Sequence, residues 1–242
     1  MKVDASHFVF EAPPVVSRAR RILIKPCANS AVPYPATTSR GMLATIISGI
    51  RRVSDADIII LDGTPDGESV IPIYQKLAYD FPRVLMLDVK DCVWVEVDNP
   101  LPKSLLVPTF WIPNVILSSD YLISVSPLKV VSGQGCLSIM NLLSLLPMKK
   151  YSEIGVGWQD LYMLGIDKVI ADLFFTLPFD LGIIEGQQKL TSVDGNKGIV
   201  ENVGKVFIGD PFQVDREVSE ALGIRTDYLD LIRLAESGLD TM

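Results

Sequence analysis

Three carboxylates lie within seven residues in the stretch DGTPDGE, which directly follows an apolar run ending at Leu61. Carboxylate oxygens are the ligands that hard cations such as Mg²⁺ prefer, and a substrate phosphate often completes the coordination shell. Asp62 and Asp66 are therefore candidate metal ligands. The alternative interpretation of this stretch is a double turn that caps the next helix.

A lysine and two glycines form a second candidate site in the stretch SPLKVVSGQG. The apolar pattern predicts a strand that delivers Lys129, and a helix over residues 136–146. A cation, backbone N–H groups at Gly133 and Gly135 and the positive end of a helix would together suit an anion, with Asn141 orienting it. The stretch has neither the GK[ST] of a Walker loop nor the GxGxxG of a dinucleotide site. Alternatively, the glycines only let strand and helix pack closely.

Two more carboxylates are candidates for acid–base chemistry, together with Lys129. Glu185 directly follows the apolar run LGII. Asp215 lies on the flank of the apolar face of a helix that begins at Pro211. A carboxylate is unusual at such a position and indicates a functional role. The interpretation is that these two groups bind a metal or serve as acid and base, so Lys129, Asp215 and Glu185 are the candidate catalytic residues.

Alternation of strands and helices along the chain predicts an α/β fold with a mainly parallel sheet, helices on both faces and one antiparallel edge strand. We read residues 1–242 as a single domain, with 105–117 as an irregular segment packed on the body or an oligomer contact. The predicted strands are 21–26, 57–61, 83–89, 92–97 (at an edge), 121–126, 181–184 and 205–208. The predicted helices are 38–53, 73–79, 136–146, 166–177, 211–222 and one that follows Thr226.

Ligands of open α/β sheets bind at the carboxyl ends of the strands. Lys25 and Asn29 follow the first predicted strand and are candidate ligand-binding residues. If the strands are parallel, they meet Asp62, Lys129, Glu185 and also Asp210 at one edge of the sheet. The alternative is that these polar residues belong to ordinary turns.

Composition excludes several classes of function. The net charge is −7 with no basic block, which argues against nucleic acid as a partner. The single histidine, His7, argues against a His-rich metal centre. The three cysteines, Cys27, Cys92 and Cys136, lie far apart in the sequence. We therefore expect neither a disulfide framework nor an iron–sulfur cluster within this chain, and we expect the protein to be located in a reducing cytoplasm.

Membrane insertion is not expected either. The start of the chain carries Asp4 and Glu11 and lacks the apolar core of a signal peptide. Residues 130–148 carry no charge, but serines, glycines and Asn141 interrupt them and Pro147 ends them. We therefore expect a soluble, cytoplasmic protein.

The order of these motifs resembles the domain of unknown function 362 family. The segments that carry the resemblance are RILIKPxxN, a TT loop, a strand ending in DG, SPLK…MNLL…LLP, FDLGIIEG and IGDPFQVDREVSEALG. Members of the family resemble α/β proteins, and some carry a ferredoxin-type [4Fe–4S] segment. Membership implies no particular activity.

The sequence departs from the family pattern around Lys129. The family usually has P-K-L-K-T-H and then a K-N pair, and here Lys129 and Asn141 match. Val130, Val131 and Met140 replace the threonine, histidine and lysine, Glu185 stands where aspartate is frequent, and the ferredoxin cysteines are missing. A general base and an anion clamp are thereby lost.

Three hypotheses of function follow. The first is a pocket at the carboxyl edge of the sheet that binds a small anion, with or without a divalent cation, in a monomer or a homo-oligomer. The second, by family analogy, is a redox or iron–sulfur-associated protein. The third is a degenerate structural or interaction protein.

Overall fold

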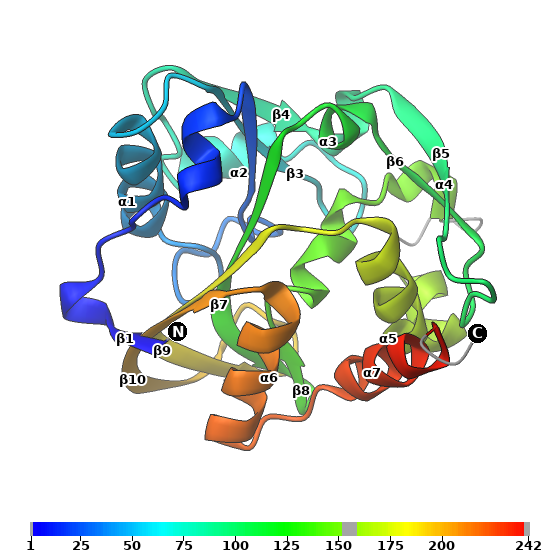
Figure 1. Ribbon diagram of the computed structural model, residues 1–242. Coiled ribbons are helices and arrows are strands. Elements are labelled where there is room, and N and C mark those ends of the chain that lie inside the picture. The colour runs from blue at the N-terminus through cyan, green and yellow to red at the C-terminus, as the bar shows by residue number, and fades with distance from the viewer. Residues whose placement is uncertain (1, 152–158, 240–242) are drawn as a thin grey trace.

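The computed structural model describes residues 2–151 and 159–239. Its centre is an eight-stranded sheet in the order β1-β10-β9-β7-β2-β3-β4, with β8 paired to β7 (Figure 1). The strands are β1 (Lys2–Asp4), β2 (Arg21–Lys25), β3 (Asp57–Asp62), β4 (Val84–Asp88), β7 (Tyr121–Val131), β8 (Gln134–Cys136), β9 (Leu181–Ser192) and β10 (Gly198–Gly209). The five neighbouring strands β9, β7, β2, β3 and β4 are parallel, while β1, β8 and β10 pair in antiparallel fashion. The predicted α/β fold with a mainly parallel sheet is confirmed.

Helices cover both faces of this sheet. They are α1 (Arg40–Arg51), α2 (Ile71–Lys76), α3 (Asn114–Leu117), α4 (Met148–Tyr151), α5 (Gln159–Thr176), α6 (Pro211–Leu222) and α7 (Asp227–Leu239), with 3-10 helices η1 (Ala5–His7), η2 (Pro14–Arg18), η3 (Val89–Asp91) and η4 (Met140–Leu145). Side chains alternate along each strand. Ile22 and Ile24 of β2 therefore pack in the cluster that contains α1, whereas Leu23 packs in the opposite cluster with Val169 and Ile170 of α5.

The sequence-based prediction for residues 126–146 is wrong. Strand β7 does not end at Lys129 but continues to Val131, turns back through two residues and pairs with β8. Ser132 and Gly133 both have positive φ, at 49° and 83°, which is the backbone conformation of a type I′ hairpin turn. The predicted helix is reduced to the short 3-10 helix η4, so no helix begins at the glycines.

The two strands predicted as short runs near the C-terminus form one long hairpin. Strands β9 and β10 each span twelve residues and pair in antiparallel fashion. Because β10 is antiparallel, it ends beside Gly182 near the start of β9, and the Asp210 carboxylate that follows it caps α6 by accepting from the Gln213 amide at 3.0 Å. Asp210 therefore does not join the other sequence candidates.

The predicted edge strand at 92–97 belongs to a different sheet. Strand β5 (Trp94–Asp98) pairs with β6 (Thr109–Pro113) in a separate two-stranded sheet. The prolines of 105–117 suggested irregular backbone, but Pro113 ends β6, where its missing N–H is tolerated. The preceding residues are held to the body by Asp172, whose carboxylate accepts from the amides of residues 105, 106 and 107 at 2.7–2.9 Å.

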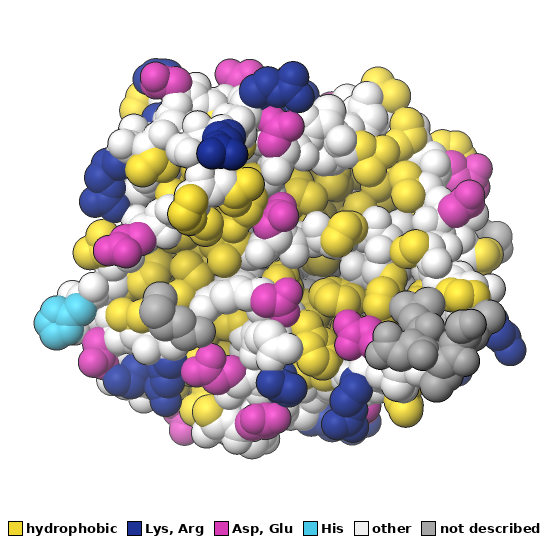
Figure 2. Space-filling model, viewed as in Figure 1, with side chains coloured by type: hydrophobic (Ala, Val, Ile, Leu, Met, Phe, Trp, Pro, Cys, Tyr) yellow, Lys and Arg dark blue, Asp and Glu magenta, His cyan; other side chains and the backbone are white. Residues whose placement is uncertain are grey.

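The surface charges and the helices concern the expectations about nucleic acid and about membrane insertion. On the face shown in Figure 2, Lys and Arg side chains are interspersed with Asp and Glu side chains. Within residues 2–151 and 159–239, no helix combines the length and the apolar character that crossing a membrane requires.

Candidate functional site

The sheet has its topological switch point between β2 and β7. From β2 the chain builds outward to β3 and β4, and then returns to β7 on the other side of β2. Strand β2 ends at Lys25, opposite Ser124, while β7 continues for seven residues beyond that level. The turn after β2 therefore faces the continuation of β7, where open α/β sheets bind their ligands.

A cavity of about 400 Å³ opens at this point, and we call it the edge pocket. Its polar and sulfur-bearing lining residues are Cys27, Asn29, Asp66, Ser126, Lys129, Cys136, Met140, Asn141, Ser144, Tyr162 and Asp194, and its other lining residues are Pro65, Val131, Leu143 and Gly195. Of the sequence candidates, the fold thus brings Lys129, Asn29, Asp66 and Asn141 to one cavity. Its volume lies in the range of about 300–1,000 Å³ typical of small-molecule pockets.

Lys129 is the basic residue that lines the edge pocket. Its side chain is only 3% exposed, and its Nζ donates to the Ala36 carbonyl at 2.9 Å and to Cys27 Sγ at 3.6 Å. An ammonium carries three N–H donors, so these contacts leave one unused. Within the described residues, no carboxylate lies within ion-pair distance of Lys129. Lys129 is therefore a buried cation without an anionic partner in this part of the chain.

Ser126 lines the same pocket and was missed by the sequence analysis. Ser126 is only 1% exposed, and its Oγ has no hydrogen-bond partner among the described residues. Most buried polar atoms in proteins have a partner, so a buried hydroxyl that lacks one indicates a missing water, ion or ligand. In the sequence, Ser126 is one small residue within an apolar strand and carries no signal of its own. It is distinguished from the other residues of that strand only by the structure, which places it beyond the level at which β2 ends.

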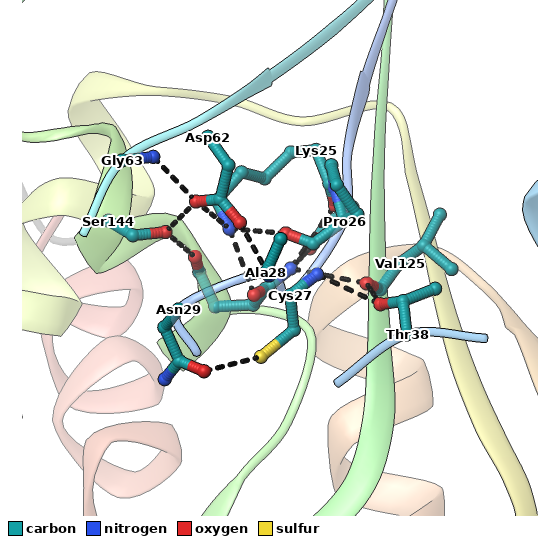
Figure 3. A network of polar contacts seen from close by, with 12 residues as sticks. Lys25, Pro26, Cys27, Ala28, Asn29, Thr38, Asp62, Gly63, Val125 and Ser144 are labelled. Carbon is teal, nitrogen blue, oxygen red and sulfur yellow. Dashed lines mark hydrogen bonds and ion pairs between the residues drawn. The ribbon is translucent and has the colours of Figure 1, made fainter. Parts of the chain in front are cut away.

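Lys25 and Asn141 are bonded to each other and to the surrounding scaffold. The Lys25 ammonium is fully buried and donates to the Pro26 carbonyl at 2.5 Å and to Asn141 Oδ1 at 3.0 Å. It also forms an ion pair with Asp62 at 3.0 Å (Figure 3). All three of its donors are thus used. Asn141 in turn donates to the Lys25 carbonyl and to Ser124 Oγ, which joins η4 to β2 and β7.

The two candidate metal ligands do not lie together as a free pair. Besides the Lys25 ammonium, the buried Asp62 carboxylate accepts from the Ala28 amide at 2.7 Å, the Gly63 amide at 2.8 Å and Ser144 Oγ at 2.5 Å. Asp66 is exposed at the rim of the edge pocket and accepts from the Glu68 amide at 3.1 Å. Among the described residues, no group of three or more His, Cys, Asp or Glu side chains is placed to hold a metal ion.

Glu185 is held at the start of helix α1. Its carboxylate accepts from the Ser39 amide at 2.9 Å and from Ser39 Oγ at 2.5 Å. Burial raises the pKa of Glu185 to about 7, and the hydrogen bonds from Ser39 oppose this shift. The side chain does not line the edge pocket. Glu185 therefore anchors the loop before α1 to β9.

Asp215 performs a similar structural task on the other side of the sheet. Its fully buried carboxylate accepts from the amides of Ser138 and Ile139 at 2.9 Å, from Ser138 Oγ at 2.6 Å and from the Tyr228 hydroxyl at 2.8 Å. Burial raises the pKa of Asp215 to about 6. The predicted helix 136–146 would have offered its positive end to a ligand anion, but the amides of Ser138 and Ile139 in this stretch bind a carboxylate of the protein.

Gly133 and Gly135 lie in the hairpin and not at a helix start. Gly133 adopts φ of +83° in the turn. The Gly135 amide donates to the Arg225 carbonyl at 2.8 Å, and a Cβ at this position would lie 2.7 Å from Ile224 Cγ2. Neither lines the edge pocket. The alternative interpretation from the sequence, that the glycines allow close packing, applies to Gly135.

Two cysteines frame Lys129 in the pocket. Cys136 is the cross-strand partner of Lys129 on β8, and burial raises the pKa of Cys136 to about 11 although Lys129 opposes the shift. Cys27 lies in the turn after β2, where its Sγ contacts Lys129 Nζ and donates to Asn29 Oδ1 at 3.7 Å. The two cysteines are far apart in the sequence, so their spacing did not indicate that both lie beside Lys129.

The loop between β2 and α1 is fastened along its length. The Thr38 amide donates to the Cys27 carbonyl at 2.9 Å, and the Cys27 amide donates back to Thr38 Oγ1 at 2.8 Å. Thr38 Oγ1 also donates to the Val125 carbonyl at 2.8 Å (Figure 3). In the middle of the loop, the Tyr34 hydroxyl accepts from the Gln188 amide at 2.7 Å. The wall of the pocket that carries Cys27 is thus held from both sides.

Comparisons with known proteins identify relatives at the level of family and fold. Residues 22–220 match the family model described as "Domain of unknown function (DUF362)". A search of curated proteins found no match. Among solved structures, the lactate racemase apoprotein from Thermoanaerobacterium thermosaccharolyticum is similar, with a TM-score of 0.54 and 14% sequence identity. The alignment covers 90% of this chain and 53% of the racemase chain, so this chain spans about half the length of that structure. At this identity the likeness concerns the fold alone.

Proposed function

This chain belongs to the DUF362 family, and we propose that it binds a small monoanion in the edge pocket, with the negative charge at Lys129. One observation carries the proposal: a buried ammonium without a carboxylate partner lines the same cavity as a buried hydroxyl without any partner. A carboxylate with two oxygens would accept from Lys129 and from Ser126.

The other buried lysine of the pocket region provides an internal comparison. Lys25 has an aspartate at 3.0 Å and uses all its donors within the protein, as buried charges generally do. Lys129 lacks such a carboxylate within the described residues, although burying an unpaired charge is costly. A bound anion would supply the missing charge. The contrast between the two lysines therefore supports anion binding at Lys129 and a scaffold role for Lys25.

The charges around the pocket favour a ligand with a single negative charge. Asp66 and Asp194 are exposed lining residues, and both carry carboxylates that would repel a dianion. The apolar side chains of Val131, Met140 and Leu143 would contact the rest of the ligand. Small monocarboxylates fit this description. Lactate, which the name of the structural neighbour mentions, is a monocarboxylate and a suitable probe beside acetate.

Isothermal titration with acetate, lactate and inorganic phosphate tests the proposal. The Lys129→Gln variant should lose roughly 1.5–3 kcal/mol of carboxylate binding, the range for a hydrogen bond to a charged group. Ser126→Ala should lose about 0.5–1.5 kcal/mol. Lys103→Gln removes the same charge from an exposed side chain and is the matched control, which should bind like the wild type.

Two outcomes would contradict the proposal. One is a wild-type protein that binds none of the three anions more tightly than Lys129→Gln does. The other is an equal loss of affinity in Lys103→Gln, which would indicate a general effect of net charge. Melting curves of each variant establish that it is folded. The iron–sulfur and interaction hypotheses stay predictions by analogy, since no observation on the described residues favours either.

A further inference from the structure

The Cys27 thiol and the Lys129 ammonium form a contact that faces the edge pocket. Their Sγ and Nζ atoms are 3.6 Å apart, and both residues line the cavity. A cation at this distance stabilises negative charge on the sulfur. Ser126, whose buried hydroxyl has no partner among the described residues, lines the same cavity and independently points to a bound water, ion or ligand there.

The backbone around Cys27 holds the sulfur in place. Both the amide and the carbonyl of Cys27 bond to Thr38, which is itself bonded to β7. The next amide, that of Ala28, donates to the buried Asp62 carboxylate at 2.7 Å. Asn29 Oδ1 accepts from the thiol at 3.7 Å, which orients the S–H group. A sulfur held in place beside a cation is one of the arrangements that activate a nucleophile.

The other two cysteines lie in less favourable surroundings. Burial, followed by the carboxylates of Asp88 and Asp91, raises the pKa of Cys92 to about 11. Burial also raises the pKa of Cys136 to about 11. Neither thiol has a hydrogen bond to a lysine among the described residues. Cys27 is thus distinguished from both by its direct contact with an ammonium.

We propose that Cys27 is the nucleophile of the edge pocket and that its substrates are small carboxylates with an electrophilic carbon. The inference rests on the proposed function, because Lys129 and Ser126 would hold the carboxylate while the sulfur attacks. In the attack, the sulfur lone pair forms an S–C bond, the leaving group departs with the electron pair of its bond to that carbon, and the thiol proton passes to solvent.

Iodoacetate is a probe with this chemistry, because it is a monocarboxylate whose carbon loses iodide when a thiolate attacks. Iodoacetamide is its neutral counterpart. The full chain is treated with each reagent, and labelling of each cysteine is followed by peptide mass spectrometry. Rates on the urea-unfolded protein correct for the intrinsic reactivity of the reagents. The ratio of iodoacetate to iodoacetamide labelling should be about 10-fold or more higher at Cys27 than at Cys92, as expected for a charged hydrogen bond.

Two further measurements make the result specific to the pocket. Lys129→Gln should lower the ratio at Cys27 to that of Cys92, whereas Lys103→Gln should leave it unchanged. In the wild type, acetate should slow the labelling of Cys27 by iodoacetate and should not slow that of Cys92. The wild-type competition keeps the test valid even if Lys129→Gln fails to fold.

The failure of this inference can be told apart from that of the proposed function. If acetate binds but the ratio of iodoacetate to iodoacetamide labelling is no higher at Cys27 than at Cys92, the nucleophile assignment is overturned and anion binding stands. If no anion binds and Cys27 reacts without preference for the charged reagent, the proposed function is overturned and this inference with it.

Discussion

Replacing Asp62 with asparagine should destabilise the fold strongly and leave anion affinity nearly unchanged. Lys25 and Asp62 are both 0% exposed and lie 3.0 Å apart, and the same carboxylate accepts from two backbone amides and a serine hydroxyl. An asparagine would leave the buried Lys25 ammonium without a negative partner. Breaking such a pair from one side costs about 3–5 kcal/mol. For a chain of this size, this corresponds to a fall in Tm of about 6–20 °C.

Urea unfolding of a double-mutant cycle provides the assay. The variants are Asp62→Asn, Lys25→Met and the combination of both. Each single variant leaves one partner unsatisfied in the interior, whereas the double variant removes both charges. The double variant should therefore be less destabilised than the sum of the single variants, by at least about 1 kcal/mol.

Two results would refute this reasoning. A fall in Tm of less than about 3 °C for Asp62→Asn would mean that the pair is not buried in solution. Additive effects in the cycle would mean that the two charges do not interact. A large loss of acetate affinity at a temperature where Asp62→Asn is folded would mean that Asp62 contributes to anion binding and not only to stability.

Two more predictions concern Glu185 and the hairpin glycines. Burial raises the folded pKa of Glu185 from 4.5 to about 7, so the folded state holds the extra proton and the free energy of unfolding should fall as pH rises through this window. Glu185→Gln cannot titrate and should reduce that fall by about 2–3 kcal/mol in urea titrations between about pH 5 and pH 8; parallel curves would contradict this. Gly135→Ala should lower the Tm more than Gly133→Ala. The Cβ at position 135 would lie 2.7 Å from Ile224 Cγ2, whereas the Cβ at position 133 meets nothing within 4 Å, so Gly133→Ala costs only the strain of an alanine at positive φ, about 1–2 kcal/mol. The reverse order of Tm values would contradict the close approach at Gly135.

The sequence was sufficient to predict the parallel centre of the fold. The apolar runs that form β2, β3 and β7 are buried on both faces, a pattern typical of central parallel strands. The helix at Pro211 was also predictable, since Asp210 caps it and Gly223 ends it in a left-handed conformation. These features are local, so they can be read from neighbouring residues.

The candidate site was only partly predictable, because its decisive contacts join distant segments. Lys25 and Lys129 both follow apolar runs, and nothing near either in the sequence tells which one has a carboxylate partner. The partner of Lys25 is Asp62, while Lys129 contacts Ala36 and Cys27. The hairpin was missed because the uncharged stretch after Lys129 fits the pattern of a buried helix. Ser132 and Gly133 were the local signal for a turn.

The fastened loop between β2 and α1 has a consequence for the kinetics of ligand association. Long loops around binding sites are often mobile, and the ligand must then select or induce the competent conformation, which lowers the apparent affinity. Here Thr38 holds one end of the loop and Tyr34 holds its middle, so the wall bearing Cys27 is ordered before any ligand arrives. A ligand entering the edge pocket therefore displaces water but orders little protein. Its association should be a single bimolecular step whose rate rises linearly with ligand concentration, without a plateau from a prior conformational change.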